Sequence, residues 1–143
     1  MEIETANLLD LGALRQLAKV SFGNDTWPLL DLIAVLTWPE VTRLKAVEAG
    51  EMIGFLAGDP RQANGVVWIA MIVVDPRFQR RGVGSALMLA CERQVKIPMM
   101  KLTVRISNQG AISMYEKLGY HTSDIWRAYY SDGEDGLVMS KKL

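Results

Sequence analysis

The feature that most constrains the fold is an apolar segment that leads directly into a glycine-rich turn. Val66–Val74 is nine apolar residues without a break and is rich in β-branched side chains, which predicts a central strand buried on both faces. Asp75-Pro76 ends this strand, and the apolar spacing after Gly84 predicts a helix over Ser85–Lys96. The segment therefore predicts a strand, a turn and a helix in direct succession.

The periodicity of apolar residues in the rest of the chain predicts a mixed α/β (α+β) architecture, a single sheet flanked by helices on both faces. We expect Asp10 and Asn108 to cap helices and Gly119 to end one in the left-handed region. With 143 residues, the chain fits a single domain over 1–143. The expected strands are Ile3–Asn7, Thr42–Glu48, Met52–Gly58, Lys101–Ile106, Tyr120–Tyr129 and Leu137–Lys141; the other helices are 11–20, Leu29–Thr37 and Gln109–Leu118; the breaks are Gly23-Asn24-Asp25 and Asp59–Gly65.

Charge and cysteine content exclude several classes of protein. Lys plus Arg and Asp plus Glu are 16 each, so no overall field draws the chain to nucleic acid or an anionic membrane. One Cys and one His leave no internal disulfide and no structural zinc site. The acidic start Met1–Glu4 lacks the bases of a signal peptide, and no apolar run reaches the roughly 20 residues of a membrane helix. We expect a cytoplasmic protein without a metal, and whether it forms a homodimer is left open.

The turn Gln79–Gly84 carries the clearest functional signal. A helix N-terminus presents amide groups without acceptors and a partial positive charge, which favours anions. Gly82 and Gly84 remove the side chains that would keep an anion from the backbone, while Arg80 and Arg81 add positive charge. This pattern predicts a diphosphate site, and the simpler alternative is a strand-to-helix turn without a ligand. A Walker loop requires Lys where Ser85 stands, and a dinucleotide fingerprint requires Gly where Leu87 stands.

Two motifs in the right order resemble the GNAT superfamily of N-acetyltransferases. Gln79-Arg80-Arg81-Gly82-Val83-Gly84 matches the superfamily's Arg/Gln-x-x-Gly-x-Gly/Ala signature, and 108–120 matches its Asn-x-x-Ala-x-x-x-Tyr-x-x-x-Gly-Phe/Tyr block. Leu102–Asn108 and Arg127–Tyr130 are similar to bacterial ribosomal-protein alanine N-acetyltransferases. The resemblance implies the GNAT fold, with a mostly antiparallel sheet, and acetyl-CoA as co-substrate.

The resemblance also implies roles for individual residues. Main-chain groups of Ile72, Val73 and Val74 would pair with the pantetheine arm where this strand diverges from Lys101–Ile106. Tyr115 would be the catalytic residue that protonates the departing thiolate, and its simpler interpretation is a core aromatic residue. The implied coenzyme-binding set is Ile72, Val73, Val74, Gln79, Arg80, Arg81, Gly82, Val83, Gly84, Ser85, Asn108, Ala111, Tyr115 and Lys117.

Thr103 departs from the pattern of the similar enzymes, which carry a glutamate there as the proposed base. At pH 7 a lysine costs about 4.6 kcal/mol to deprotonate and an α-amine about 1 kcal/mol. The sequence therefore favours an acceptor amine that is easily neutral, such as a protein N-terminus or a small amine. The alternatives are a CoA-binding sensor or interaction module with the same fold, and an unrelated nucleotide-binding protein.

Several chemically versatile side chains have simpler interpretations. We expect His121 to be a surface residue and Cys91 a buried structural thiol. The acidic loop Ser131–Gly136 is expected to be solvated, although its carboxylates could attract a cationic acceptor. At most one of Tyr129 and Tyr130 is expected to face an acceptor groove. Trp27, Trp38 and Trp68 could form a pocket wall, but burial in the apolar core is their simpler interpretation.

Overall fold

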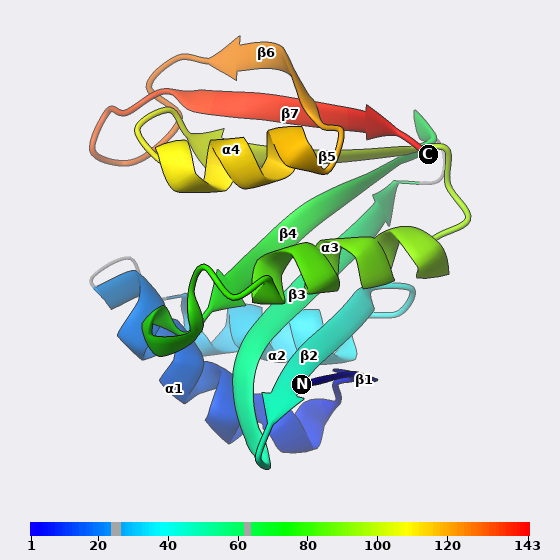
Figure 1. Cartoon of the computed structure of the whole chain (residues 1–143), viewed down its shortest axis with the longest axis vertical. Helices are drawn as coiled ribbons and strands as arrows, with labels where there is room; N and C mark the ends of the chain where they lie inside the picture. The colour runs from blue at the N-terminus through cyan, green and yellow to red at the C-terminus, as the bar shows by residue number, and fades with distance from the viewer. Residues whose placement is uncertain (24–26, 62–63) are drawn as a thin grey trace.

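The computed structural model describes residues 1–23, 27–61 and 64–143. Within these ranges seven strands form one sheet in the order β1-β2-β3-β4-β5-β7-β6, in which every pairing is antiparallel except that of β4 with β5. This confirms the predicted mixed sheet (Figure 1). The strands are β1 Glu2–Thr5, β2 Thr42–Glu48, β3 Glu51–Arg61, β4 Val66–Val74, β5 Met99–Arg105, β6 His121–Trp126 and β7 Gly136–Lys142; the helices are α1 Leu11–Phe22, α2 Leu29–Thr37, α3 Val83–Gln94 and α4 Gln109–Lys117, with 3-10 turns η1 Leu8–Asp10 and η4 Pro76–Phe78.

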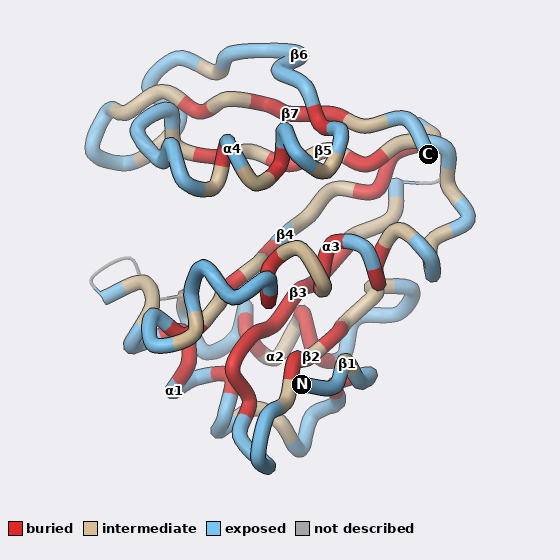
Figure 2. Tube along the Cα trace, viewed as in Figure 1, coloured by how far each residue is buried: buried red, intermediate tan, exposed pale blue. Residues whose placement is uncertain are grey.

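The helices cover both faces of the sheet, as the apolar pattern predicted. On one face, Leu14 of α1 and Leu32 of α2 pack with Phe55 of β3. On the other face, Leu87 of α3 and Ile112 of α4 belong to a second core cluster. Figure 2 shows that the buried residues concentrate along the central strands between these layers. None of the helices in the described ranges is long and apolar enough to cross a membrane.

Some predicted boundaries are wrong for identifiable reasons. β3 continues through Asp59 and Pro60, because both pair with β4, so the predicted polar turn begins only after Arg61. Residues 62–63 of that turn lie outside the described ranges, as do residues 24–25 of the predicted break after the first helix. Asp10 caps no helix with its side chain. Asn7 caps the preceding turn η1, where its Oδ1 accepts from Leu9 N at 2.8 Å, while the Asp10 carboxylate accepts from Asn7 N at 2.9 Å, a capping box. Asp10 still stands at the N-cap position of α1, as predicted.

Several helix and strand ends also differ from the prediction by one to three residues. α3 starts at Val83 and ends at Gln94, two residues earlier at each end than expected. β6 ends at Trp126 instead of Tyr129, so that both tyrosines that follow belong to the loop before β7. Gly119 has φ +100° after α4, as predicted.

The sheet opens between its two parallel strands. β4 and β5 pair only through Val66–Trp68 and Met99–Lys101, after which they diverge (Figure 1). The register of β4 against β3 passes from Ile69 to Met71, so Ala70 is the extra residue of a β-bulge, a feature that bends a strand. Ala70 is exposed, which corrects the predicted burial of β4 on both faces.

Candidate functional site

The turn between β4 and α3 is built by a short capped segment. Asp75 caps η4, because its Oδ1 accepts from Arg77 N at 2.9 Å. Arg80 and Gly82 then adopt left-handed φ angles of +66° and +79°. Such a conformation is strained for Arg80 and easy for Gly82. A Cβ at Gly82 would meet no atom within 4 Å, so this glycine serves the backbone conformation and leaves the space in front of it open.

The amide groups of this turn match the requirement of an anion site. The first amide of α3 with a backbone acceptor is that of Ala86, which donates to Gly82 O at 2.9 Å. Across the described ranges, no acceptor lies within hydrogen-bond distance of the amides of residues 79–85. Gln79, Arg80 and Arg81 are exposed beside them. The turn therefore combines a row of amides that make no hydrogen bond to a described residue with two exposed cations, Arg80 and Arg81.

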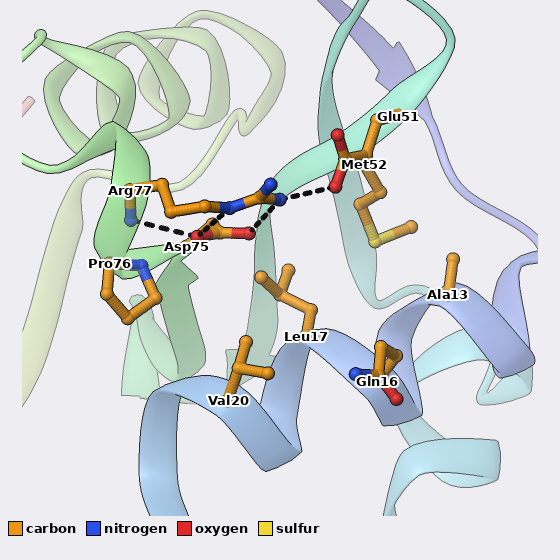
Figure 3. Close-up of a pocket in the computed structure, with 9 residues that line it drawn as sticks. All are labelled: Ala13, Gln16, Leu17, Val20, Glu51, Met52, Asp75, Pro76 and Arg77. Carbon is orange, nitrogen blue, oxygen red and sulfur yellow. Dashed lines mark hydrogen bonds and ion pairs between the residues drawn. The ribbon is translucent and has the colours of Figure 1, made fainter.

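The Arg77 side chain anchors the turn to β3. Its guanidinium donates to Asp75 Oδ2 at 2.9 Å and to Glu51 Oε1 at 2.5 Å. Its hydrogen bonds hold the pKa of the Asp75 carboxyl below its usual value. These groups border a pocket of ≈ 520 Å³ whose other wall is α1, with Leu17 and Val20 pointing into it (Figure 3).

Neither this pocket nor a second one contains a predicted site residue. The second, of ≈ 470 Å³, lies between the end of α3 and Pro60. The donors of the turn and the open β4 edge lie outside both pockets. Amides and a strand edge without partners require a ligand that can hydrogen-bond with them, whereas a pocket alone sets no such requirement. We therefore place the candidate site at the opening between β4 and β5.

Helix α4 packs on α3 through a glycine. A Cβ at Gly84 would lie 3.0 Å from Met114 Sδ, so Gly84 lets α4 approach the first turn of α3. Asn108 caps α4, because its Oδ1 accepts from Ala111 N at 3.2 Å. The structure thus gives Asn108 a capping role, as predicted, and brings α4 beside the turn. Lys117 is exposed in the last turn of α4.

Tyr115 of α4 is buried, with 4% of its surface exposed. No described residue makes a hydrogen bond to the Tyr115 hydroxyl. Among the described residues, every side-chain oxygen or nitrogen that is fully buried has a hydrogen-bond partner. The hydroxyl must therefore touch accessible space. Burial raises the pKa of Tyr115 well above that of a free phenol, and the neighbouring Tyr130 adds to the rise. The phenol is protonated at neutral pH.

The opposite side of the opening is lined from β5 and from the loop before β7. Thr103 is half-buried, and a Cβ at Gly136 would lie 2.8 Å from its Cγ2 and 3.3 Å from Tyr129 Cδ2. Thr103 is thus beside Tyr129 on this face. Tyr129 is 53% exposed and Tyr130 is half-buried. Because both lie in the loop after β6, the strand alternation behind the prediction for this pair does not apply.

The acidic loop is exposed at Ser131, Asp132 and Gly133, as the sequence predicted, but its carboxylates also bind groups of the protein. Asp132 and Glu134 both accept from Arg105 Nη1, and Asp135 accepts from Ala128 N at 2.8 Å. Its carboxylates are therefore committed to the protein itself. The sequence analysis assigned no role to Arg105, and only its place in the motif-bearing segment 102–108 could have indicated one.

The remaining candidates lie away from the opening. His121 is exposed on β6, and Cys91 is fully buried in α3, where burial raises the pKa of its thiol to about 12. The burial of Cys91 agrees with the prediction of a buried structural thiol. Trp38 is 63% exposed, so its predicted burial in the core is wrong. Trp27 and Trp68 are half-buried. No group of three possible metal ligands occurs among the described residues.

Comparison with known proteins identifies relatives that match this chain over most or half of its length. An N-alpha-acetyltransferase of Sulfurisphaera tokodaii is 27% identical over 99% of this chain and 92% of its own. The [ribosomal protein bS18]-alanine N-acetyltransferase of Escherichia coli K12 is 43% identical over 75 residues, which are 48% of this chain and 51% of that protein.

Solved structures show the same fold over nearly the whole chain. The crystal structure of the ribosomal-protein-S18-alanine N-acetyltransferase from Escherichia coli matches with a TM-score of 0.88 and 26% identity, covering 99% of this chain and 92% of that one. Arabidopsis thaliana NAA60 in complex with acetyl-CoA matches with a TM-score of 0.82 at 16% identity, covering 99% and 98%. The family model "Acetyltransferase (GNAT) family" matches residues 11–120. The chain therefore belongs to the acetyltransferase (GNAT) family, and the predicted acyltransferase class is confirmed.

Proposed function

We propose that this protein transfers the acetyl group of acetyl-CoA directly to an amine, and that the opening between β4 and β5 is where this happens. The observation that carries the proposal is the row of amides at residues 79–85, which finds no acceptor among the described residues. A pyrophosphate supplies the acceptors that such a row requires. The family relationship identifies the carrier of that pyrophosphate as a thioester of coenzyme A.

The coenzyme arm would lie along the β4 edge that β5 leaves. From Ile69 to Val74 this edge faces no paired strand in the described structure, and main-chain groups of Ile72, Val73 and Val74 can pair with the amides of an extended pantetheine arm. Asn108 and Ala111 at the start of α4 would close the other side. Ser85 and Lys117 complete the proposed set, in which Lys117 is the residue farthest along α4. Since one sheet carries both sides of the opening, the proposal takes residues 1–143 as a single domain.

Tyr115 is proposed as the general acid. The neutral amine nitrogen attacks the thioester carbonyl carbon, the carbon–sulfur bond breaks, and the Tyr115 hydroxyl protonates the departing sulfur; the amine loses its proton to water. A phenol with a raised pKa gives up its proton less readily. Burial also raises the pKa of a thiol, so a buried thiolate takes up a proton more readily. Cys91 is the internal example, because burial raises the pKa of its thiol to about 12. The donor and the acceptor of the proton are thus shifted together.

We propose a protein N-terminal α-amine as the acceptor. Thr103 offers no carboxylate to deprotonate an ammonium, so an α-amine, which costs about 1 kcal/mol to neutralise at pH 7, is easier to acetylate than a lysine at about 4.6 kcal/mol. The names of the full-length relative from Sulfurisphaera tokodaii and of the bS18 enzyme point the same way. Small amines of low pKa satisfy the same condition and are the second acceptor class.

A thiol-release assay with acetyl-CoA tests both parts of the proposal. Short peptides with free N-termini, the same peptides with blocked N-termini and one internal lysine, and a panel of small amines serve as acceptors. Release of CoA with free N-termini only, and a mass increase of one acetyl group on the peptide, is the expected result. Release with blocked lysine peptides only would refute the α-amine assignment.

A CoA-binding module without turnover is the alternative, favoured by Thr103 in place of the expected carboxylate. The two proposals differ in one measurement. Acetyl-CoA binding by calorimetry without thiol release for any acceptor would select the sensor. Weak binding of acetyl-CoA together with tight binding of ATP would refute both.

A further inference from the structure

Arg105, at the end of β5, holds the acidic loop and an aromatic ring in one cluster. Its Nη1 donates to both carboxylate oxygens of Asp132, at 3.0 and 2.9 Å, and to Glu134 Oε1 at 2.9 Å. Its Cζ lies 4.2 Å from the centroid of the Tyr130 ring. One cation thus balances two carboxylates and stacks on a phenol ring.

The same loop is fixed through its main chain to the connection between β5 and α4. Glu134 Oε2 accepts from Ser107 N at 2.8 Å, and Ile106 N donates to Asp135 O at 3.2 Å. Within the loop, Tyr130 N donates to Glu134 O at 3.1 Å. The loop therefore has one position relative to the turn that leads into α4 and to Tyr115.

Tyr130 is the first ring in a row that leads to the opening. Its centroid lies 5.0 Å from that of Tyr129, the Tyr129 ring 5.2 Å from Trp126, and the Trp126 ring 5.6 Å from Trp68. Trp68 is the last β4 residue that pairs with β5. The row thus ends where the strands diverge, and Tyr129 is its most exposed tyrosine.

We infer that Arg105 is a positioning residue for the amine acceptor. It fixes Tyr130, and through Tyr130 the exposed Tyr129, as one wall of the acceptor site. This inference rests on the proposed N-acetyltransferase function. Without the guanidinium, Asp132 and Glu134 are like charges without their shared cation, and their repulsion releases the loop. Acceptor binding must then order the loop first, which lowers acceptor affinity. The amides of residues 79–85, which hold the pyrophosphate in the proposal, lie on another segment, so we expect the main coenzyme contacts to stay in place.

The test compares Arg105→Met with Arg127→Met. Arg127 pairs with Asp135 of the same loop at 3.4 Å and has a side chain 83% exposed, so its loss controls for the removal of a loop cation. We expect Arg105→Met to raise the KM for the acceptor peptide roughly tenfold, with kcat and the KM for acetyl-CoA within about twofold of wild type. Arg105→Lys should restore part of the acceptor affinity, because a lysine can pair with one carboxylate but cannot bridge both in the same way. Arg127→Met should leave all three constants unchanged.

Hydrogen exchange provides a second readout that does not depend on turnover. The Gly133 amide donates to Tyr130 O at 2.9 Å inside the loop, and its exchange should be about tenfold faster in Arg105→Met. The inference is overturned if the acceptor KM of Arg105→Met stays at the wild-type value, if Arg127→Met has the same effect, or if loop exchange is unchanged. A wild-type chain that binds acetyl-CoA but acetylates no amine overturns the proposed function and with it the acceptor role, while exchange still decides whether Arg105 holds the loop.

Discussion

Gly82 offers the sharpest test of the anion site, because one position allows charge to be separated from strain. At φ +79° any L side chain costs about 1 kcal/mol of folding stability. A Cβ there would meet no atom within 4 Å, so a side chain can leave the backbone at this position without a clash at its Cβ. Gly82→Glu and Gly82→Gln therefore carry the same strain and nearly the same volume, and they differ by one negative charge.

The expected difference follows from Coulomb's law. Two unit charges 4 Å apart interact with about 1 kcal/mol in water and about 4 kcal/mol at an effective dielectric constant of 20. Since about 1.4 kcal/mol is tenfold in affinity, Gly82→Glu should bind CoA about 5-fold to about 700-fold more weakly than Gly82→Gln. The assay is calorimetric titration with CoA at about 0.1 M and about 1 M salt, where the screening length falls from about 10 Å to about 3 Å.

Two outcomes would refute the reasoning. Equal CoA affinities of the Glu and Gln variants would mean that no phosphate lies near Gly82. A difference that persists at high salt would mean that the charge acts through the fold and not through the ligand. Urea unfolding of both variants is the control, and their free energies of unfolding should agree.

Three further predictions concern the core of the site. Tyr115→Phe should lower kcat about 10²-fold with little change in CoA affinity. The control Tyr120→Phe, which removes a hydrogen bond to Glu92, should lower the free energy of unfolding and leave kcat unchanged. Equal kcat values for Tyr115→Phe and wild type would refute the assignment of Tyr115 as the general acid. Gly54→Ala should destabilise the fold by about 1–3 kcal/mol and weaken CoA binding, because its Cβ would lie 2.9 Å from Val83 Cγ1 in the first turn of α3; urea unfolding and calorimetry check both. Hydrogen bonds from Arg77 lower the folded pKa of Asp75 below the unfolded one. The Asp75 carboxylate therefore stabilises the fold above about pH 4, and this stabilisation is lost as the pH falls through the folded pKa. Asp75→Asn should lose less free energy of unfolding than wild type between pH 5 and pH 2, and equal losses would contradict this.

The elements that the sequence predicted well are those with local signals. Val66–Val74 has strand propensity throughout and a proline after its end, and its bounds agree with the structure. The glycine turn also has a local cause, because a left-handed residue at 82 requires a glycine there. Asn108 and Gly119 likewise act at the helix ends where their types predicted them.

The features that the sequence did not reveal depend on contacts between distant residues. Arg105 meets Asp132 across 27 positions, a separation that no periodicity encodes. Asp10 was predicted as an N-cap from its residue type and stands at that position of α1, but only the geometry shows that its carboxylate closes a capping box with Asn7. The opening between β4 and β5 was expected only from the family resemblance, since the apolar run gives no sign of the extra residue Ala70.

The extra residue in β4 also determines what each later side chain of the strand contacts. Before it, Val67 and Ile69 pack on the side of α3; after it, Ile72 and Val74 do so, while Met71 and Val73 pack on the side of α1. Odd and even positions therefore exchange sides at Ala70. A chain that lacked this alanine could keep both helical layers packed only by straightening the strand, and a straight strand would continue alongside β5 and close the space in which a thioester could lie.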